Sequence, residues 1–143
     1  MALQELIYTS LANPASSHAA VQDILKSSQR NNVAHEITGL LLFDGDRYIQ
    51  ILEGVPQNLD LLFSKISSDS RHHSLELLHR GPVASRAFSD WRMAYEEMPK
   101  GLLDDLAENM AVYAMENEGE ILDPEDSFGA RLNGMFMDAI AAE

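Results

Sequence analysis

The chain has 143 residues, of which 45% are hydrophobic, and this is enough to build the packed core of one domain. It contains no cysteine, which excludes disulfides, thiolate chemistry and zinc–cysteine sites. The net charge of −13 opposes binding to a nucleic-acid backbone, and no apolar run is long enough to span a membrane. The N-terminus also lacks the pattern of a signal peptide, so we expect a cytoplasmic protein.

The first half of the chain predicts a strand, a helix and then a hairpin. Residues 3–10 read as the first strand, and a serine at position 16 or 17 caps an expected helix that continues to about residue 31. Residues 37–43 form a nearly continuous apolar run, as in a central strand, and residues 47–53 form the next strand. Asp44-Gly45 between these two runs is the strongest short-range signal for a hairpin.

A second helix begins at Gly54-Val55-Pro56, because the following leucines, phenylalanine and isoleucine recur at helical spacing. Residues 74–81 and 91–96 predict a fourth and a fifth strand. The order βαββαβ plus one strand predicts the α+β class, with a ferredoxin-like sandwich that carries two helices on one face of its sheet.

Residues 101–143 are expected to form an acidic C-terminal helical extension, separate from a domain at residues 1–100. The extension contains 1 Lys or Arg against 11 Asp or Glu, whereas residues 1–100 contain 9 against 12. Its periodicity predicts two helices, at residues 102–115 and 128–141. The charge indicates a solvated face, and a basic partner surface is the alternative interpretation.

Gln50 fits its surroundings least well, because it lies in the middle of an expected buried strand. A buried amide without a partner costs about 1–3 kcal/mol, so a group must hydrogen-bond to it. Strand alternation places Gln50 with Tyr48, and Tyr8 with Ser10. If both faces point toward the helices, Tyr8 and Gln50 meet, and a phenol and an amide can satisfy each other.

Four further residues are candidates for the site, and each also has a plainer interpretation. Trp91 and Met93 share one face of the fifth strand, where such residues usually serve as packing. Asn31-Asn32 ends the first helix, where asparagine usually terminates a helix, but its side chain can also pair with an imide edge such as that of a flavin. The histidines lack the spacing of a metal site, and no Gly-rich phosphate loop is present. Together, the polar positions suggest a ligand whose hydrogen bonds can change.

The sequence resembles the BLUF domains, the sensors of blue light using FAD, over residues 3–98. The matching stretches occur in family order and are Leu6-Ile7-Tyr8-Thr9-Ser10, Asn31-Asn32, Ile37-Thr38-Gly39-Leu40-Leu41, Tyr48-Ile49-Gln50-Ile51-Leu52-Glu53-Gly54, Asp69-Ser70-Arg71-His72 and Phe88-Ser89-Asp90-Trp91-Arg92-Met93. The resemblance implies the sandwich fold already predicted, with residues 1–100 as the photosensor domain and a flavin between its two helices.

The resemblance also implies roles for individual residues. Tyr8 gives an electron and a proton to the excited flavin, Gln50 rearranges its hydrogen bonds, and Trp91 and Met93 carry the signal out. Asn32 holds the imide edge of the flavin. The other implied cofactor-binding positions are Ile24, Ser28, Asn31, Leu41, Tyr48, Ile66 and His72, with Lys65 and Arg71 as partners for a flavin oxygen or phosphate. The cofactor is FAD, with FMN or riboflavin as alternative occupants.

A protein of this kind is expected to be a non-enzymatic photoreceptor. We expect it to assemble as a dimer or larger homo-oligomer and to act on a separate signalling protein, without binding nucleic acid or a membrane. The alternative is a ferredoxin-like regulatory or assembly module without a chromophore, which would be colourless. A small acyl-phosphate hydrolase on the same sandwich is disfavoured, because residues 11–17 contain neither the arginine nor the glycine of a phosphate loop.

Overall fold

The computed structural model describes residues 2–13, 23, 25–27, 30, 36–69, 72–88 and 94–116. The described residues at 23, 25–27 and 30 are helical, in line with the predicted first helix. The rest of that helix and the helix predicted at residues 128–141 lie outside the described residues.

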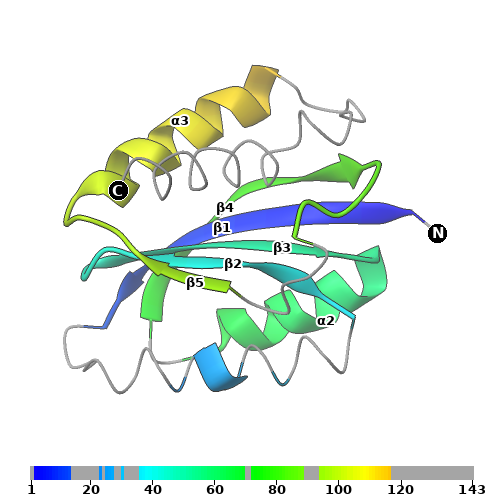
Figure 1. The fold of residues 1–143 in the computed structure, drawn as a ribbon, viewed down its shortest axis with the longest axis horizontal. Coiled ribbons are helices and arrows are strands. Elements are labelled where there is room, and N and C mark those ends of the chain that lie inside the picture. The colour runs from blue at the N-terminus through cyan, green and yellow to red at the C-terminus, as the bar shows by residue number, and fades with distance from the viewer. Residues whose placement is uncertain are drawn as a thin grey trace.

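Five strands form one sheet in the order β4-β1-β3-β2-β5 (Figure 1). Their bounds are Leu3–Ala12 for β1, Thr38–Phe43 for β2, Arg47–Gly54 for β3, His72–Val83 for β4 and Ala94–Glu97 for β5. Neighbouring strands run antiparallel, except for the parallel pair β2 and β5. The α+β, ferredoxin-like prediction is therefore confirmed, and so is the additional fifth strand.

Helices cover both faces of this sheet. Helix α2 (Pro56–Ser67) lies against one face, and helix α3 (Leu102–Glu116) lies against the opposite face (Figure 1). Strand alternation separates the core into two clusters. The cluster on the α2 face includes Leu6, Tyr8, Leu41, Tyr48, Leu52, Leu59 and Leu62. The cluster on the α3 face includes Ile7, Leu40, Leu42, Ile49, Ile51, Leu103, Ala107 and Met110. The central strands β1 and β3 are buried because both faces are covered.

The hairpin predicted at Asp44-Gly45 joins β2 to β3. The Asp44 carboxylate accepts hydrogen bonds from the backbone N–H groups of Asp46 at 3.1 Å and Arg47 at 2.8 Å. Gly45 has a φ of 98°, in the left-handed region that glycine adopts without strain. Gly39 on β2 allows the close approach of β3, because a Cβ at this position would lie 1.9 Å from the Ile51 carbonyl oxygen.

The two ladders of β1 differ in regularity. Its pairing with β3 runs without interruption from Gln4↔Gly54 to Leu11↔Arg47. Its pairing with β4 shifts register twice, between Ile7 and Tyr8 and again between Thr9 and Leu11. The β3 side of β1 therefore holds a fixed alignment, and the bulges lie on the β4 side.

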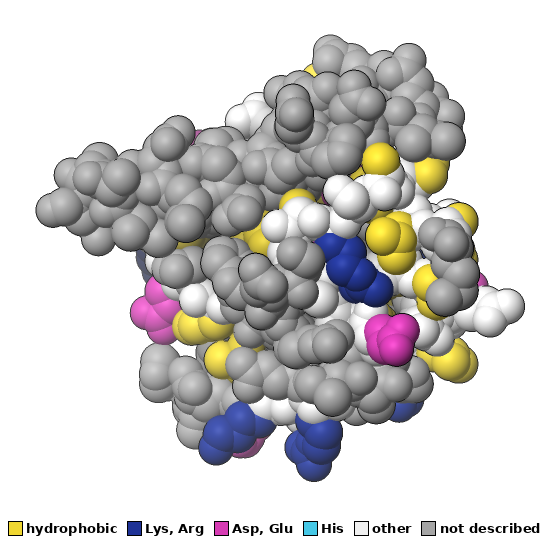
Figure 2. All heavy atoms as spheres, turned by 45° about the vertical axis from the view of Figure 1, so that its right-hand side comes forward, with side chains coloured by type: hydrophobic (Ala, Val, Ile, Leu, Met, Phe, Trp, Pro, Cys, Tyr) yellow, Lys and Arg dark blue, Asp and Glu magenta, His cyan; other side chains and the backbone are white. Residues whose placement is uncertain are grey.

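The exposed hydrophobic side chains are spread over several elements. The large ones are Leu61 on α2, Leu77 on β4, and Leu102 and Val112 on α3. On the side of the molecule in Figure 2, the described hydrophobic side chains lie in small groups, with basic and acidic side chains between them. Within the described ranges, the helices fall short of the length and apolar character that crossing a membrane requires.

Candidate functional site

A buried hydrogen bond joins Tyr8 on β1 to Gln50 on β3. The two residues are direct partners in the antiparallel register, and both side chains lie on the α2 face. The Tyr8 hydroxyl donates to Gln50 Oε1, with Tyr8 4% and Gln50 2% exposed. The sequence-based expectation that a phenol and an amide meet beneath the helices is confirmed. The amide that seemed out of place in a buried strand has its oxygen satisfied by a phenol.

The environment of Tyr8 keeps its phenol protonated. Burial raises the pKa of Tyr8 far above its ordinary value, and the neighbouring Asp69 and Tyr48 raise it further. Losing a proton alone would leave a buried anion near the charge of Asp69. Losing an electron and a proton together creates no net charge on the ring. The site therefore favours chemistry in which the electron and the proton leave Tyr8 together.

Aromatic rings surround this hydrogen-bonded pair. The ring of Tyr8 lies 6.0 Å from that of Phe63 and 6.2 Å from that of His72, measured between centroids. Tyr48 stacks on Phe43 at 4.6 Å and meets His72 edge-on at 6.4 Å. Such arrangements give each ring a defined orientation.

Leu41 completes the neighbourhood of Gln50 on the other side. It is the direct partner of Gln50 on β2, and it is buried in the same cluster. Gln50 is therefore flanked by a phenol from β1 and an aliphatic side chain from β2. Of these two direct partners, Tyr8 is the one that offers Gln50 a hydrogen bond.

His72 is held by two hydrogen bonds that join three elements. Its Nε2 lies 2.8 Å from the carbonyl oxygen of Ile66 on α2, and its Nδ1 lies 2.6 Å from the hydroxyl oxygen of Ser10 on β1. A carbonyl oxygen only accepts, so Nε2 carries a hydrogen. In the neutral ring, Nδ1 then accepts from the Ser10 hydroxyl. These bonds fix the imidazole beside both Tyr8 and Tyr48.

The structure brings together most of the predicted site residues that it describes. Tyr8, Leu41, Tyr48, Gln50, Ile66 and His72 all lie on the α2 face of the sheet or against it. Lys65 lies in the last turn of α2 and is exposed. The remaining predicted site residues, Ile24, Ser28, Asn31, Asn32, Arg71, Trp91 and Met93, lie outside the described residues.

Glu53 was missed by the sequence reasoning, although the same signal that singled out Gln50 could have found it. It is a charged residue in an apolar strand, and it is 0% exposed. Its carboxylate accepts hydrogen bonds from Thr38 Oγ1 at 3.0 Å, Ala87 N at 2.6 Å and Phe88 N at 2.9 Å. It therefore ties β3 to the connection between β4 and β5, on the α3 side of the sheet.

Glu53 is expected to make folding stability depend on pH. Burial raises the pKa of the Glu53 carboxyl above its ordinary value of 4.5, outweighing the hydrogen bonds that lower it. A carboxyl that binds its proton more tightly in the folded state stabilises the protein most below the ordinary value. That contribution is lost as the pH rises through the folded-state pKa. The stability advantage of the wild type over Glu53→Gln should therefore be smaller at neutral pH than at a pH below the ordinary value of 4.5.

Urea unfolding of both proteins at the two pH values measures this change. Glu76→Gln, at an exposed position on β4, is the matched control, and its difference from the wild type should stay constant. A pH-independent gap between the wild type and Glu53→Gln would contradict the expectation.

Comparison with known proteins gives this arrangement a context. The solved dark-state structure of BlrB, a BLUF protein, matches with a TM-score of 0.69 and 30% identity, over 80% of this chain and 92% of that chain. Photoactivated adenylate cyclase subunit alpha of Euglena gracilis is 32% identical over 93 residues, which are 64% of this chain and 9% of that protein. The blue light- and temperature-regulated antirepressor BluF of Escherichia coli (strain K12) is 31% identical over 77 residues, 53% of this chain and 19% of that protein.

The fold is that of a light-sensing flavin domain. Residues 3–94 match the family described as sensors of blue-light using FAD. The chain belongs to this family, the BLUF domains, and is a blue-light sensor that uses FAD. It spans only 7% of the beta subunit and 9% of the alpha subunit of the Euglena cyclase that it matches.

The described part of the site fits a flavin chemically. A glutamine amide carries two N–H donors in addition to the oxygen that Tyr8 contacts, and a flavin ring presents carbonyl and ring-nitrogen acceptors. Phe63 and Ile66 on α2 face the same cluster and supply apolar surface for a planar ring. A donor-bearing amide, an oxidisable phenol and apolar walls therefore occur together.

Proposed function

We propose that this chain senses blue light by exchanging the hydrogen-bond partners of Gln50. The observation that supports this proposal is the buried bond from the Tyr8 hydroxyl to Gln50 Oε1. Bound FAD supplies the absorption of light and, when excited, an oxidant strong enough to take an electron from a phenol.

Tyr8 and Gln50 are proposed to move one proton between them. The proton that leaves Tyr8 with its electron passes to Gln50 Oε1, which is the atom that its hydroxyl contacts. When the electron returns to Tyr8, a proton returns with it. If that proton comes from Oε1 of an amide that has turned, the amide is left rotated, and if it comes from the amide nitrogen, the amide is left in its other tautomer. No bond to the cofactor forms or breaks, so a chain without cysteine can perform the cycle. The change is confined to the protons and hydrogen bonds of Gln50, in a buried setting where such differences are large.

The remaining cofactor contacts stay proposals. We assign Asn32 to the imide edge of the flavin, and Ile24 and Ser28 to the walls of its ring. Asn31, the chain neighbour of Asn32, is assigned to cofactor binding. Lys65 and Arg71 are proposed to face flavin oxygens or phosphates, and the exposed position of Lys65 suits a charged group at the rim. Trp91 and Met93 are proposed to take part in signal output.

The output is proposed to be non-enzymatic and to occur in the cytoplasm. Residues 1–100 would act as the sensor domain, and residues 101–143 as an extension that takes part in assembly. The named cyclases among the relatives support a coupling of such sensors to effectors. We propose that this chain acts on a separate protein and on further copies of itself, as a dimer or larger. Its charge of −13 disfavours nucleic acid as the partner.

Removing residues 102–143 should change the oligomeric state. Leu103, Ala107 and Met110 of α3 pack on the apolar cluster of the sheet, and their loss would uncover it. An uncovered apolar sheet face associates, so the truncated protein should form larger species than the full chain. Size-exclusion chromatography with light scattering measures the size of the truncated protein.

The full chain with Val112→Ser, at an exposed position on α3, is the control and should elute as the wild type does. An unchanged, monodisperse profile of the truncated protein would rule out the extension as an assembly element.

An absorption spectrum of the purified protein, recorded in the dark and after blue illumination, tests the function directly. We expect a flavin spectrum that shifts slightly to the red in light and recovers in the dark. A colourless protein that cannot be reconstituted with FAD would contradict the proposal. That result would favour the regulatory or assembly module without a chromophore.

A further inference from the structure

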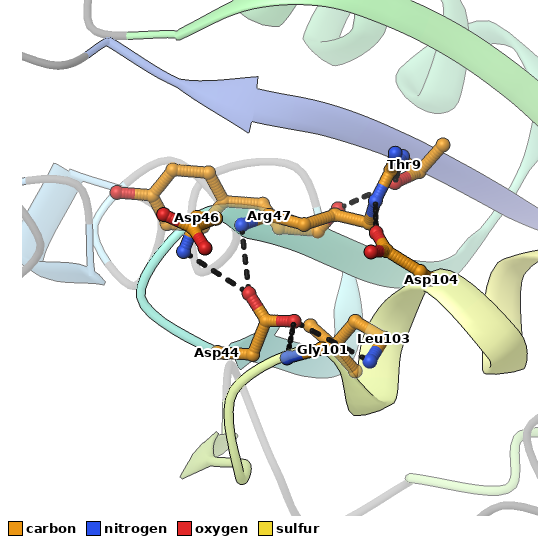
Figure 3. A network of polar contacts seen from close by, with 8 residues as sticks. Thr9, Asp44, Asp46, Arg47, Gly101, Leu103 and Asp104 are labelled. Carbon is orange, nitrogen blue, oxygen red and sulfur yellow. Dashed lines mark hydrogen bonds and ion pairs between the residues drawn. The ribbon is translucent and has the colours of Figure 1, made fainter.

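The turn between β2 and β3 is joined to the start of helix α3. Asp44 is 6% exposed, and one oxygen of its carboxylate binds the turn itself. The other oxygen accepts hydrogen bonds from the backbone N–H groups of Gly101 at 3.2 Å and Leu103 at 3.4 Å (Figure 3). The sheet thus supplies an acceptor for N–H groups at a helix N-terminus, where negative charge is also favoured by the helix dipole.

Arg47 extends this contact back into the sheet. Its Nε donates to Asp104 of α3 at 2.7 Å, and its Nη1 donates to the Thr9 hydroxyl oxygen at 2.9 Å. The Thr9 hydroxyl in turn donates to the carbonyl oxygen of Tyr48 at 2.9 Å. Figure 3 shows Arg47 between Asp104 on the helix and Thr9 on β1. We call Thr9, Asp44, Arg47 and their partners Gly101, Leu103 and Asp104 the turn–helix junction.

We call Tyr8 and Gln50 the photochemical pair. The turn–helix junction lies on the α3 side of the sheet, opposite to this pair. Thr9 is the chain neighbour of Tyr8, and Tyr48 precedes Gln50 by two residues on β3. Tyr8 belongs to the cluster on the α2 side and bonds to Gln50 there, whereas the hydroxyl of Thr9 reaches Arg47 and, through it, α3. The bond from Thr9 to the Tyr48 carbonyl spans the same two strands as the Tyr8–Gln50 bond. A shift between these strands therefore acts on both bonds.

We propose that the turn–helix junction couples the hydrogen bonding of Tyr8 and Gln50 to helix α3, with Thr9 and Arg47 as positioning residues. This rests on the proposed function, because it requires a light-driven change at Gln50. When β1 and β3 adjust to the new partner of Gln50, Thr9 carries the guanidinium of Arg47 with it. Asp104 and the N-terminal turn of α3 follow, because Asp44 holds them to the same turn. Light should therefore change how often the hydrogen bonds of α3 open by local unfolding, and breaking the junction should remove that effect.

Amide hydrogen exchange of the full FAD-loaded chain tests this coupling. The peptide covering residues 102–112 is compared in the dark and under continuous blue light. In the wild type we expect at least a two-fold difference in exchange rate. In Asp104→Asn and in Thr9→Val the difference should fall to less than half of the wild-type value. The light-minus-dark difference is the readout, since a merely structural role would change exchange equally in both states.

Asp46→Asn is the matched control. It removes the same charge as Asp104→Asn, but from the β2–β3 turn, where the carboxylate is exposed and pairs with Lys100 at 3.7 Å rather than with α3. It should keep the full light-dependent difference. Asp104 is 64% exposed, so its replacement is compatible with folding even where Thr9→Val is not.

The outcomes separate the coupling from the function. A wild type that shows the red shift but no light-dependent exchange in α3 overturns the coupling and leaves the photoreceptor function intact. A difference that persists undiminished in Asp104→Asn also overturns it. A wild type without any red shift overturns the proposed function, and the coupling with it.

Discussion

Tyr8→Phe is expected to bind FAD and to show no light-induced red shift. Phenylalanine retains the ring that contacts Phe63 and His72 but lacks the hydroxyl that donates to Gln50 Oε1. It also lacks a transferable proton and is much harder to oxidise than a phenol. Loss of the buried donor should cost about 1–3 kcal/mol of folding stability, which a packed domain tolerates. Absorption spectra before and after blue illumination measure the result.

Tyr95→Phe is the matched control for this variant. Tyr95 packs against the same core cluster, and its hydroxyl donates to Glu97 at 3.1 Å rather than to the photochemical pair. Its removal should leave the red shift unchanged. A normal red shift in Tyr8→Phe would show that the phenol is not the donor, and the proposed photochemistry would have to be abandoned.

Gln50→Leu should likewise bind FAD and lose the red shift. Leucine has nearly the volume of glutamine and suits a buried strand, so the core should stay filled. It has no group that can receive the Tyr8 proton or present a new donor afterwards. The change also removes the acceptor of the Tyr8 hydroxyl, which is expected to cost about 1–3 kcal/mol. Illuminated and dark spectra of the variant, together with its urea midpoint, measure both effects.

The same substitution at an exposed position separates photochemistry from general perturbation. Gln57→Leu on α2 adds the same apolar group outside the site, and its spectra should match those of the wild type. An unchanged red shift in Gln50→Leu would remove Gln50 from the mechanism. Loss of FAD binding in Gln50→Leu would instead assign it a purely binding role.

The sequence predicts the sheet well because its signals are local. Asp44-Gly45 between two apolar runs predicts the hairpin, and period-two alternation predicts that Tyr8 and Gln50 lie on matching faces. The hydrogen bond between them then follows from the register of two central strands. In this chain, fold and photochemical pair are therefore readable from short stretches of sequence.

The contacts of α3 with the sheet could not be predicted in the same way. Asp44 bonds to Gly101 and Leu103, which are 57 and 59 residues away in the chain. The sequence correctly predicts that Asp44 is a turn residue, and a turn aspartate uses one carboxylate oxygen within the turn. The sequence does not predict the partners of the second oxygen. The helical pattern of residues 102–115 likewise predicts a helix without revealing which strands it will contact. Such pairings depend on tertiary arrangement rather than on propensity.

The unequal ladders of β1 bear on how this sheet tolerates insertions and deletions. One added residue in β3 would turn Gln50 to the opposite face, because side chains alternate with a period of two. On the other side of β1, two bulges already absorb mismatched residues from β4, and the alignment of Tyr8 with Gln50 is undisturbed. We therefore expect a one-residue insertion to disturb the Tyr8–Gln50 pair less in β4 than in β3. Strand β4 can diverge in sequence and length while the distance between the two reacting side chains stays constant.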